Sequence, residues 1–317
     1  MKRPFVTDAT LTAIAIGYRN QAQTLIADRV LPRMPVDEDF KWMFYPLEEG
    51  FNAPDARIGR RGRPNQFEFT GQERTSTIED FGYDAPIPYS DVNRARRLRE
   101  AKLSTIDPEK RAAEGLADML LLQREVRVAG MVQNTANYDA SRRLALTGTA
   151  RFENYGGTSD PINVIKDGLD GTLVYRPNTV VMGQPVWSKL RSHPDLVNAV
   201  KGTESGKGMI SRREFEELFE VQQLLVGESF VNLAKPGQTA SLGRVWGKHI
   251  ALLYVDPAPA AEKLTWGFTG EYGTKVGGRI EDEDMGLDGG FRIRVGEKVK
   301  EVVCAPSVGY LIQDAVS

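Results

Sequence analysis

The sequence is poor in the residues that form disulfides and metal sites. It contains one cysteine, Cys304, and two histidines among 317 residues. A single cysteine cannot form an intrachain disulfide, and one cysteine with two histidines nearly excludes a zinc site built from these residues. Cys304 lies in the apolar stretch VVCAP, which favours a buried small hydrophobic residue over a reactive thiol.

Long apolar runs and an excess of positive charge are also missing. No stretch of 18 apolar residues occurs, so the sequence predicts no membrane-spanning helix. The formal net charge is −2, whereas proteins that bind nucleic acid by neutralising phosphates usually carry a strong basic excess. We therefore expect any contact with DNA to be local and weak. The apolar run from Leu11 to Ile16 is short, which favours an N-terminal arm with a short helix near Thr7 to Ala27 over a secretion signal.

Motifs for catalysis and ligand binding are absent as well. The stretch from Gly202 to Lys207 has the wrong glycine spacing for a phosphate-binding loop, and Gly208 follows the lysine in place of Ser or Thr. The acidic run from Glu281 to Asp284 lacks the register of a calcium loop; a solvated charge run is favoured over a cation site. His193 and His249 have no partner in the sequence that suggests catalysis. Because an active site needs a converging set of groups, we expect no enzyme, no metal and no cofactor.

The most prominent positive feature is a long predicted helix from Asp107 to about Asn134. Asp107 is a suitable N-cap, and Pro108 occupies the first helical position, where a missing N–H costs nothing. A helix of this length measures roughly 39 Å, which suits a spine. Its predicted apolar stripe consists of Ala112, Leu116, Met119, Leu120, Val126, Val128, Met131 and Val132.

Residues 41–90 are predicted to form a long two-stranded β-ribbon that extends away from the rest of the chain, which we call the excursion. Phe40 to Leu47 reads as one strand, and the alternation that includes Phe67 and Phe69 reads as the start of the returning strand. Because an isolated ribbon is marginally stable in water, this excursion must lie on another surface. Its tip carries four arginines and no lysine: Arg57, Arg60, Arg61 and Arg63. These predict a docking patch for an acidic surface or for phosphate, with a solvated charge run as the alternative.

The remaining segments interleave short helices and strands without a regular βαβ repeat. Short helices are expected after Asp160, near Pro185–Arg191 and Pro194–Lys201, and from a capping box of Ser211 and Glu214 to Gly227. A buried strand is expected at Asn178–Gly183, and further strands at Arg244–Pro257 and Leu264–Tyr272. Three separate short strands are expected to close the chain: FRIRV, EKVKEVVCAP and GYLIQDAV. A second basic cluster predicts a solvated helix face or an intersubunit contact: Arg94, Arg96, Arg97 and Arg99. This arrangement predicts a mixed α+β fold.

The order of these parts resembles that of the major capsid proteins of tailed bacteriophages, which have the Hong Kong 97-type fold. The stretch IADRVLPRMPV (26–36) and the C-terminal stretch from VGGRIEDEDMG to GYLIQDAV carry the local resemblance. The resemblance implies the following parts: an N-terminal arm (1–50), an extended β-hairpin called the E-loop (51–81), the spine helix with a peripheral domain (82–176), an axial domain (177–272), and C-terminal strands that return to the peripheral domain (273–317).

The resemblance also implies a function. The chain would self-assemble, through hexamers and pentamers, into the icosahedral shell around the double-stranded DNA of a phage, and would be found in the virion after assembly in the bacterial cytoplasm. The implied partners are a separate scaffold or protease, a portal, packaged DNA held by weak non-specific contacts, and a decoration protein, with no membrane. The E-loop arginines, with Phe67 and Phe69, would make intersubunit contacts. The alternatives are an encapsulin-type nanocompartment shell with a protein cargo, and an enzyme with an unrecognised site.

One family feature is missing from the sequence. Some members cross-link an E-loop lysine to a neighbouring subunit, but no lysine occurs between Lys41 and Lys102. We therefore expect no such cross-link. No sustained heptads precede the excursion, so scaffolding would come from a separate protein, or the sequence is that of a mature form.

Overall fold

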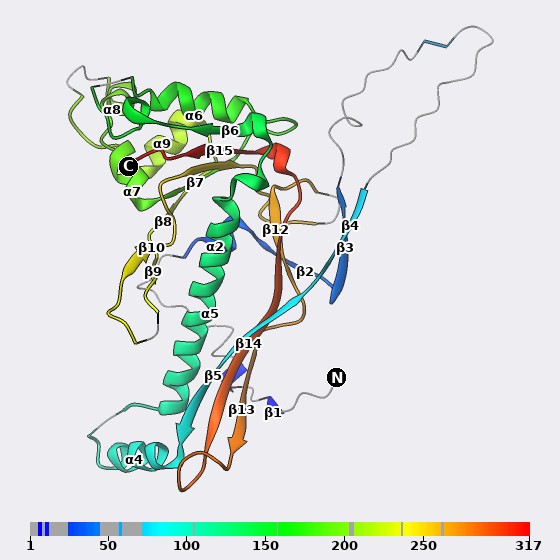
Figure 1. The fold of residues 1–317 in the computed structure, drawn as a ribbon, viewed down its shortest axis with the longest axis vertical. Helices are drawn as coiled ribbons and strands as arrows, with labels where there is room; N and C mark the ends of the chain where they lie inside the picture. The colour runs from blue at the N-terminus through cyan, green and yellow to red at the C-terminus, as the bar shows by residue number, and fades with distance from the viewer. Residues whose placement is uncertain are drawn as a thin grey trace.

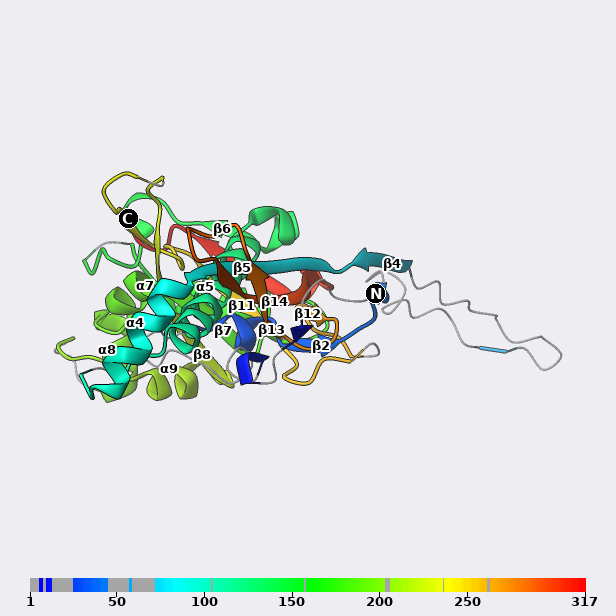
Figure 2. The same cartoon turned by 90° about the horizontal axis from the view of Figure 1, so that it is seen from below.

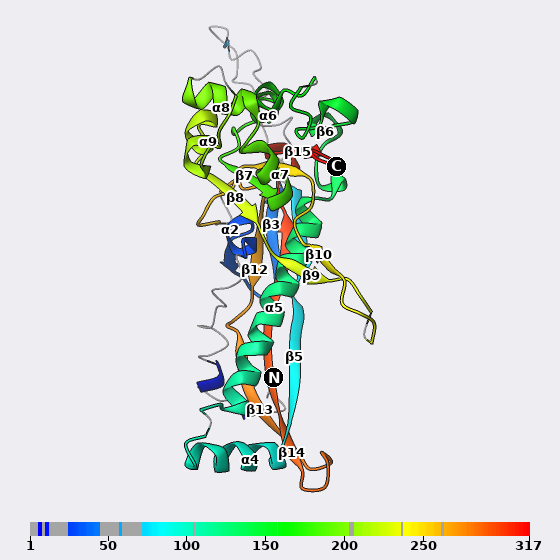
Figure 3. The ribbon, with the colours of Figure 1, turned by 90° about the vertical axis from the view of Figure 1, so that its left-hand side faces the viewer.

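One long helix, α5 (Pro108–Val132), connects the two halves of an elongated molecule (Figure 1). The computed structural model describes residues 6–7, 10–12, 25–44, 57–58, 72–103, 105–156, 158–202, 206–235, 237–260 and 263–317. At one end of α5, helices surround a sheet and form an upper body. Along the rest of α5 a second sheet forms a narrow lower blade (Figures 1 and 3).

The predicted spine helix is confirmed, but its buried face is different from the predicted stripe. Asp107 caps the helix, and its carboxylate accepts a hydrogen bond from the Glu109 N–H at 3.1 Å. Met119 is 52% exposed and Val126 is 37% exposed, so including these two residues in the apolar stripe was wrong. Ala113 and Ala117 are buried in their place, because small side chains let the helix approach the sheet closely.

The lower sheet is organised around β14, the longest strand. One edge of β14 pairs with β13 and then with β12, while the other edge pairs with β5. The residues predicted to form two separate strands here form one strand that continues through Gly296. Leu116 and Leu120 of α5 pack on Phe291 and Ile293. The strands of this sheet are β1 (Val6–Thr7), β13 (Val276–Asp282), β14 (Gly290–Val303), β12 (Gly267–Glu271), β2 (Arg33–Pro35) and β5 (Glu79–Pro88).

The upper body contains a five-stranded sheet with the order β6-β15-β11-β7-β8. Its strands are β6 (Arg143–Ala145), β15 (Gly309–Gln313), β11 (Ile250–Leu253), β7 (Thr179–Gly183) and β8 (Gln223–Gly227). Four helices accompany it: α6 (Pro161–Asp170), α7 (Gln184–Leu190), α8 (Pro194–Lys201) and α9 (Arg212–Phe219). Every residue of β7 is buried, as predicted, and apolar side chains from the helices and the sheet form one continuous core.

Two predicted elements of the upper body have different limits. The capping box of Ser211 and Glu214 is confirmed, but α9 ends at Phe219 and not at Gly227. Glu220 adopts a left-handed conformation with φ 53°, and Leu225 lies in β8. The strand predicted from Arg244 to Pro257 is reduced to the four residues of β11, because the chain around Trp246 crosses the sheet before β11 begins.

The base of the excursion is an antiparallel pair, β3 (Asp39–Phe44) with β4 (Gln72–Thr77). Figure 2 shows this pair on the side of the molecule opposite the helices of the upper body. The strand predicted to Leu47 is observed to Phe44. Of the helix predicted between Thr7 and Ala27, residues 10–12 are helical and α2 (Ala27–Val30) begins at its end; most of the rest lies outside the described residues.

Three further elements lie at the edges. Helix α4 (Tyr89–Glu100) lies across the lower end of the blade, and β9 (Phe230–Asn232) pairs with β10 (Leu242–Arg244) in a separate hairpin. Within the described ranges, no helix has both the length and the apolar character that crossing a membrane requires.

An ion pair between β5 and β14 gives the fold a measurable pH dependence. Asp84 lies opposite Arg294, whose Nε and Nη2 donate to the carboxylate at 2.7 and 2.6 Å. The hydrogen bond from Arg294 lowers the pKa of Asp84 below its ordinary value of 3.8. The pair therefore stabilises the fold fully above pH 3.8, and this contribution is lost as the pH falls further through the lowered pKa.

Replacing Asp84 with asparagine is expected to remove about 0.5–1 kcal/mol of stability at pH 7, because the pair is partly exposed. Melting temperatures measured by calorimetry at pH 7 and below pH 3.8 would test this. The difference between wild type and Asp84→Asn should shrink on acidification; a difference that is independent of pH would contradict this role for the ion pair.

Candidate assembly surfaces

Two charged residues lie completely buried in the middle of α5. Arg124 is 1% exposed and Glu125 is 0% exposed. The Glu125 carboxylate accepts hydrogen bonds from the Ile26 N–H at 3.0 Å and the Ala27 N–H at 2.8 Å, which are amides at the start of α2. It also accepts from the indole N–H of Trp246 at 2.5 Å. One carboxylate thus fixes the N-terminal segment and the Trp246 segment to the spine, and it satisfies helix amides that would otherwise be unpaired.

Opposing effects act on this carboxyl group. Burial raises the pKa of Glu125, while the hydrogen bonds from Trp246, Ile26 and Ala27 oppose the rise because they favour the charged form. Burial likewise lowers the pKa of Arg124, while the negative charges of Glu297 and Glu301 oppose this change. The site therefore depends on accurate mutual positioning of charged groups, since a buried charge without its partners is strongly destabilising.

Around these two residues lies a larger set of charged side chains, all but Glu125 joined in ion pairs, which we call the junction network. It consists of Asp28, Arg33, Arg124, Glu125, Arg127, Glu271, Glu297 and Glu301. Arg33 contacts Asp28 at 3.0 Å, Glu271 at 2.7 Å and Glu297 at 3.0 Å. Arg124 pairs with Asp28 and donates to the Leu31 carbonyl. The network joins the N-terminal segment, the spine and strands β12 and β14.

The junction network lies where the excursion begins. Arg33 is the first residue of β2, which runs parallel to β12, and the chain then enters β3. Phe40 of β3 and Ile78 after β4 are buried against Phe268 and Val302. The base of the hairpin is therefore packed on β12 and β14.

Of the predicted intersubunit residues, only one lies in the described part of the chain. Arg57 is exposed. The other predicted contact residues lie outside the described residues: Arg60, Arg61, Arg63, Phe67 and Phe69. Their role in assembly stays a prediction.

The second basic cluster lies on α4, which has no buried residue. All four of its arginines are exposed: Arg94, Arg96, Arg97 and Arg99. Arg99 approaches Asp107 at 3.4 Å. The exposed helix fits either of the two predicted roles, a solvated face or an intersubunit contact.

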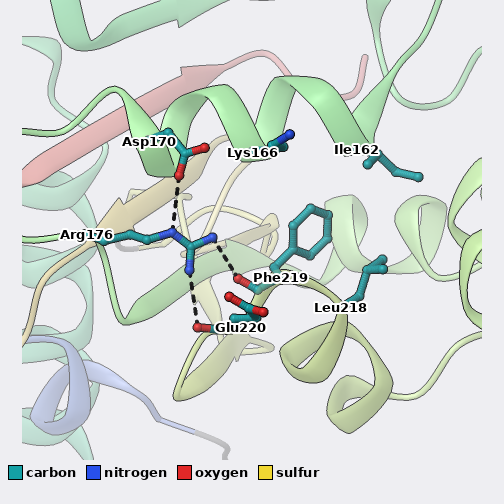
Figure 4. Close-up of a pocket in the computed structure, with 7 residues that line it drawn as sticks. All are labelled: Ile162, Lys166, Asp170, Arg176, Leu218, Phe219 and Glu220. Carbon is teal, nitrogen blue, oxygen red and sulfur yellow. Dashed lines mark hydrogen bonds and ion pairs between the residues drawn. The ribbon is translucent and has the colours of Figure 1, made fainter.

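A pocket opens between α6 and the end of α9 (Figure 4). Its volume is about 410 Å³. Arg176 lies across it and donates to Asp170 at 3.3 Å and to the Phe219 carbonyl at 3.1 Å. Ile162 and Leu218 provide apolar lining beside this polar bridge. The lining of the pocket is therefore both polar and apolar.

The two histidines have structural roles. His193 caps α8 by accepting from the Asp195 N–H at 3.3 Å, and His249 accepts from the Asp314 N–H at 3.1 Å. Burial lowers the pKa of both. In the acidic run, Glu281 pairs with Arg279 at 2.9 Å. Among the described residues, no three His, Cys, Asp or Glu side chains cluster in a way that could hold a metal ion.

The sequence prediction missed the junction network, although the chain carries a signal for it. Arg124 stands in the row Leu116, Leu120, Arg124, Val128, Val132, in which each residue follows the previous one by four positions. Residues spaced in this way share one helix face, so Arg124 belongs to the buried row and requires internal partners. The identity of those partners could not be read from the sequence.

Comparisons with known proteins agree with this architecture. No family model matches the chain. The chain is 40% identical over 316 residues to the major capsid protein of Pseudomonas phage JBD67, covering 99% of this chain and 98% of that protein. A crystal structure of a phage-related protein from Bordetella bronchiseptica superposes with a TM-score of 0.74 at 24% identity, covering 99% of both chains. The capsid of cyanophage P-SCSP1u superposes with a TM-score of 0.60 at 11% identity, covering 95% of this chain and 92% of that one.

Proposed function

Because this chain belongs to the family of phage major capsid proteins, we propose that its many copies form a closed icosahedral shell around the double-stranded DNA of a phage. The observation that carries this proposal is the 40% identity to a phage capsid protein over 99% of the chain. The mixed α+β fold supports it independently, because it superposes on the cyanophage capsid over 95% of its length. We infer that the protein works by assembly and not by catalysis.

The shape of the subunit supports assembly by exchange of extended parts. The β3–β4 pair and the β9–β10 pair are two-stranded sheets outside the two main sheets, and isolated ribbons of this kind are marginal in water. In a shell, contacts between copies would stabilise such ribbons by mass action. In this proposal the E-loop is 51–81, the N-terminal arm 1–50, the spine and peripheral domain 82–176, the axial domain 177–272, and the returning strands 273–317.

The junction network would then help to set the orientation of one subunit relative to its neighbour. It fixes the base of the E-loop to the spine through β2 and β12. An E-loop lying over a neighbour would hold that neighbour in a defined direction relative to this spine. A portal, a separate scaffold or protease, and a decoration protein are further partners that the proposal includes.

The content of the shell distinguishes the proposal from an encapsulin-type compartment. Particles isolated from phage-producing bacteria should contain double-stranded DNA that resists nuclease until the shell is opened. Particles that contain a single enzyme cargo and no protected DNA would contradict the phage shell. Because the net charge is −2, we expect DNA to be held by weak contacts, and opened shells should release it at moderate salt.

Replacing Arg57, Arg60, Arg61 and Arg63 together with alanine is expected to lower the yield of assembled particles by roughly tenfold or more. Each lost ion pair is modest, but the loss is repeated in every copy of a cooperative shell. Sedimentation velocity of purified protein would measure the assembled fraction. Replacing Arg94, Arg96, Arg97 and Arg99 on α4 with alanine compares the two basic clusters at equal charge change, and a reduced yield there would favour the intersubunit role of α4 over a solvated face. Unchanged assembly of the E-loop variant would refute the docking role.

A further inference from the structure

The β9–β10 hairpin exposes large apolar side chains away from the core. Leu233 and Leu242 are each 70% exposed, and Phe230 is 47% exposed. By register, Phe230 and Leu242 lie on one face of the ribbon, while Leu233 reaches across Gly243 on the other. Figure 3 shows the hairpin projecting from the side of the upper body. Apolar residues on both faces of a projecting ribbon mark a contact surface.

The α6–α9 pocket is a different surface from the hairpin. The base of the hairpin lies beside the start of α9, where Arg212 pairs with Glu228 at 2.5 Å, whereas the pocket lies at the end of α9 and is lined by Leu218, Phe219 and Glu220. A contact between the hairpin of one copy and the pocket of another would therefore be heterologous. Such a contact, repeated from copy to copy, closes into a ring when the rotation between copies allows it.

We propose that the β9–β10 hairpin of one copy inserts into the α6–α9 pocket of the next copy and thereby links subunits head to tail. This inference deepens the proposed function and rests on it. The pocket volume of about 410 Å³ and the apolar lining of Ile162 and Leu218 suit the leucine side chains of the hairpin. A second copy of this chain is the expected occupant, because the family relationship makes many identical copies the normal environment of this surface.

The charges of the two surfaces favour one orientation of the hairpin relative to the pocket. The segment from Phe230 to Arg244 contains Lys235 and Arg244 and no acidic residue. At the end of α9, Glu220 lines the pocket, and the exposed Glu217 lies one turn earlier, where it pairs with Arg213 at 3.0 Å. The α6 side of the pocket carries Lys166, and Arg176 is engaged by Asp170 and the Phe219 carbonyl. The basic hairpin would therefore approach the pocket from its acidic α9 edge.

Site-directed cross-linking tests this contact. Cys304 is half-buried, and burial raises its pKa to about 12, so it stays a thiol and reacts poorly with maleimides. The Leu233→Cys/Leu218→Cys double variant, assembled and treated with a short bis-maleimide, should give a ladder of linked subunits on a denaturing gel. Each single variant should remain monomeric on that gel, because a heterologous contact joins two different residues.

The outcomes separate this contact from the proposed function. Normal particles of the double variant without cross-links would overturn the hairpin contact and leave the shell function standing. Linked dimers from Leu233→Cys alone would show a two-fold contact and would also overturn it. Failure of the wild-type chain to form any particle would overturn the shell function and this contact with it.

A charge substitution provides a second test. The Leu233→Asp/Leu242→Asp variant should reduce the assembled fraction by roughly tenfold, since a desolvated carboxylate is strongly disfavoured in the contact, and its melting temperature as unassembled protein should stay close to that of wild type. Leu103→Asp/Leu287→Asp is the matched control, because Leu103 is 76% and Leu287 is 100% exposed outside the hairpin. Equal assembly of the hairpin variant and the control would contradict the contact.

Discussion

Replacing Glu125 with glutamine is expected to destabilise the subunit by about 3 kcal/mol, because it disrupts a fully buried charged group. All three groups that bind the carboxylate are donors: the Ile26 and Ala27 amides and the Trp246 indole. Glutamine would direct an NH₂ group at one or more of these donors. The melting temperature should fall by roughly 5–10 °C.

A second glutamate on the same helix is the control for this experiment. Glu114 is partly exposed and approaches Lys110 at 3.8 Å, so Glu114→Gln should change the stability by less than about 0.5 kcal/mol. Calorimetry of the unassembled subunit would measure both variants. If Glu125→Gln were as stable as Glu114→Gln, the Glu125 carboxylate would not be an important connection between the N-terminal segment and the spine.

Replacing Gly227 with alanine is expected to have an effect of similar size through steric overlap. Gly183 and Gly227 face each other at the ends of β7 and β8, and the Trp246 segment crosses directly over both. A Cβ at position 227 would lie 1.9 Å from Cδ1 of Trp246. The indole would have to move, and its hydrogen bond to Glu125 would be lost as well. We expect a loss of about 3 kcal/mol or more.

Gly130→Ala is the matched control for the glycine experiment. Gly130 lies in α5, and a Cβ there would meet no atom within 4 Å. Alanine at this helical position should stabilise the subunit by about 0.5–1 kcal/mol. Urea unfolding should therefore show shifts of opposite sign for the two variants. If Gly227→Ala were as stable as wild type, the close packing of the Trp246 ring on Gly227 would be contradicted.

The two large effects should also depend on each other. Both substitutions weaken the bond between Trp246 and Glu125, so the double variant should lose less stability than the sum of the single variants. Full additivity would indicate that the Trp246 contact and the Glu125 contact act independently.

Local signals in the sequence predicted the helices well. Asp107 with Pro108 fixed the start of α5, and Ser211 with Glu214 fixed the start of α9. Such signals act within one turn of helix, so they can be recognised in the sequence without knowledge of the tertiary structure. The end of α9 was misplaced because Leu225 suits a buried strand as well as a helix face, and only the pairing of β8 with β7 distinguishes the two.

Contacts between segments that are far apart in the sequence could not be predicted. Arg124 reveals by its position that it is buried, but its partners Asp28 and Thr269 are remote in the sequence. Gly227 appears in the sequence as an ordinary strand-end glycine, and only the crossing of Trp246 explains why a larger residue cannot replace it. The overall order of elements was recognisable because it resembles a known family; the contacts that hold these elements together were not.

The size of the purified protein in solution tests the shell function most directly. Light scattering across a range of protein and salt concentrations, followed by negative-stain electron microscopy of the main peak, would show the assembly state. We expect closed shells tens of nanometres across, or rings with five-fold and six-fold symmetry. A compact monomer that persists under all these conditions would contradict the account of the chain as a self-assembling shell subunit.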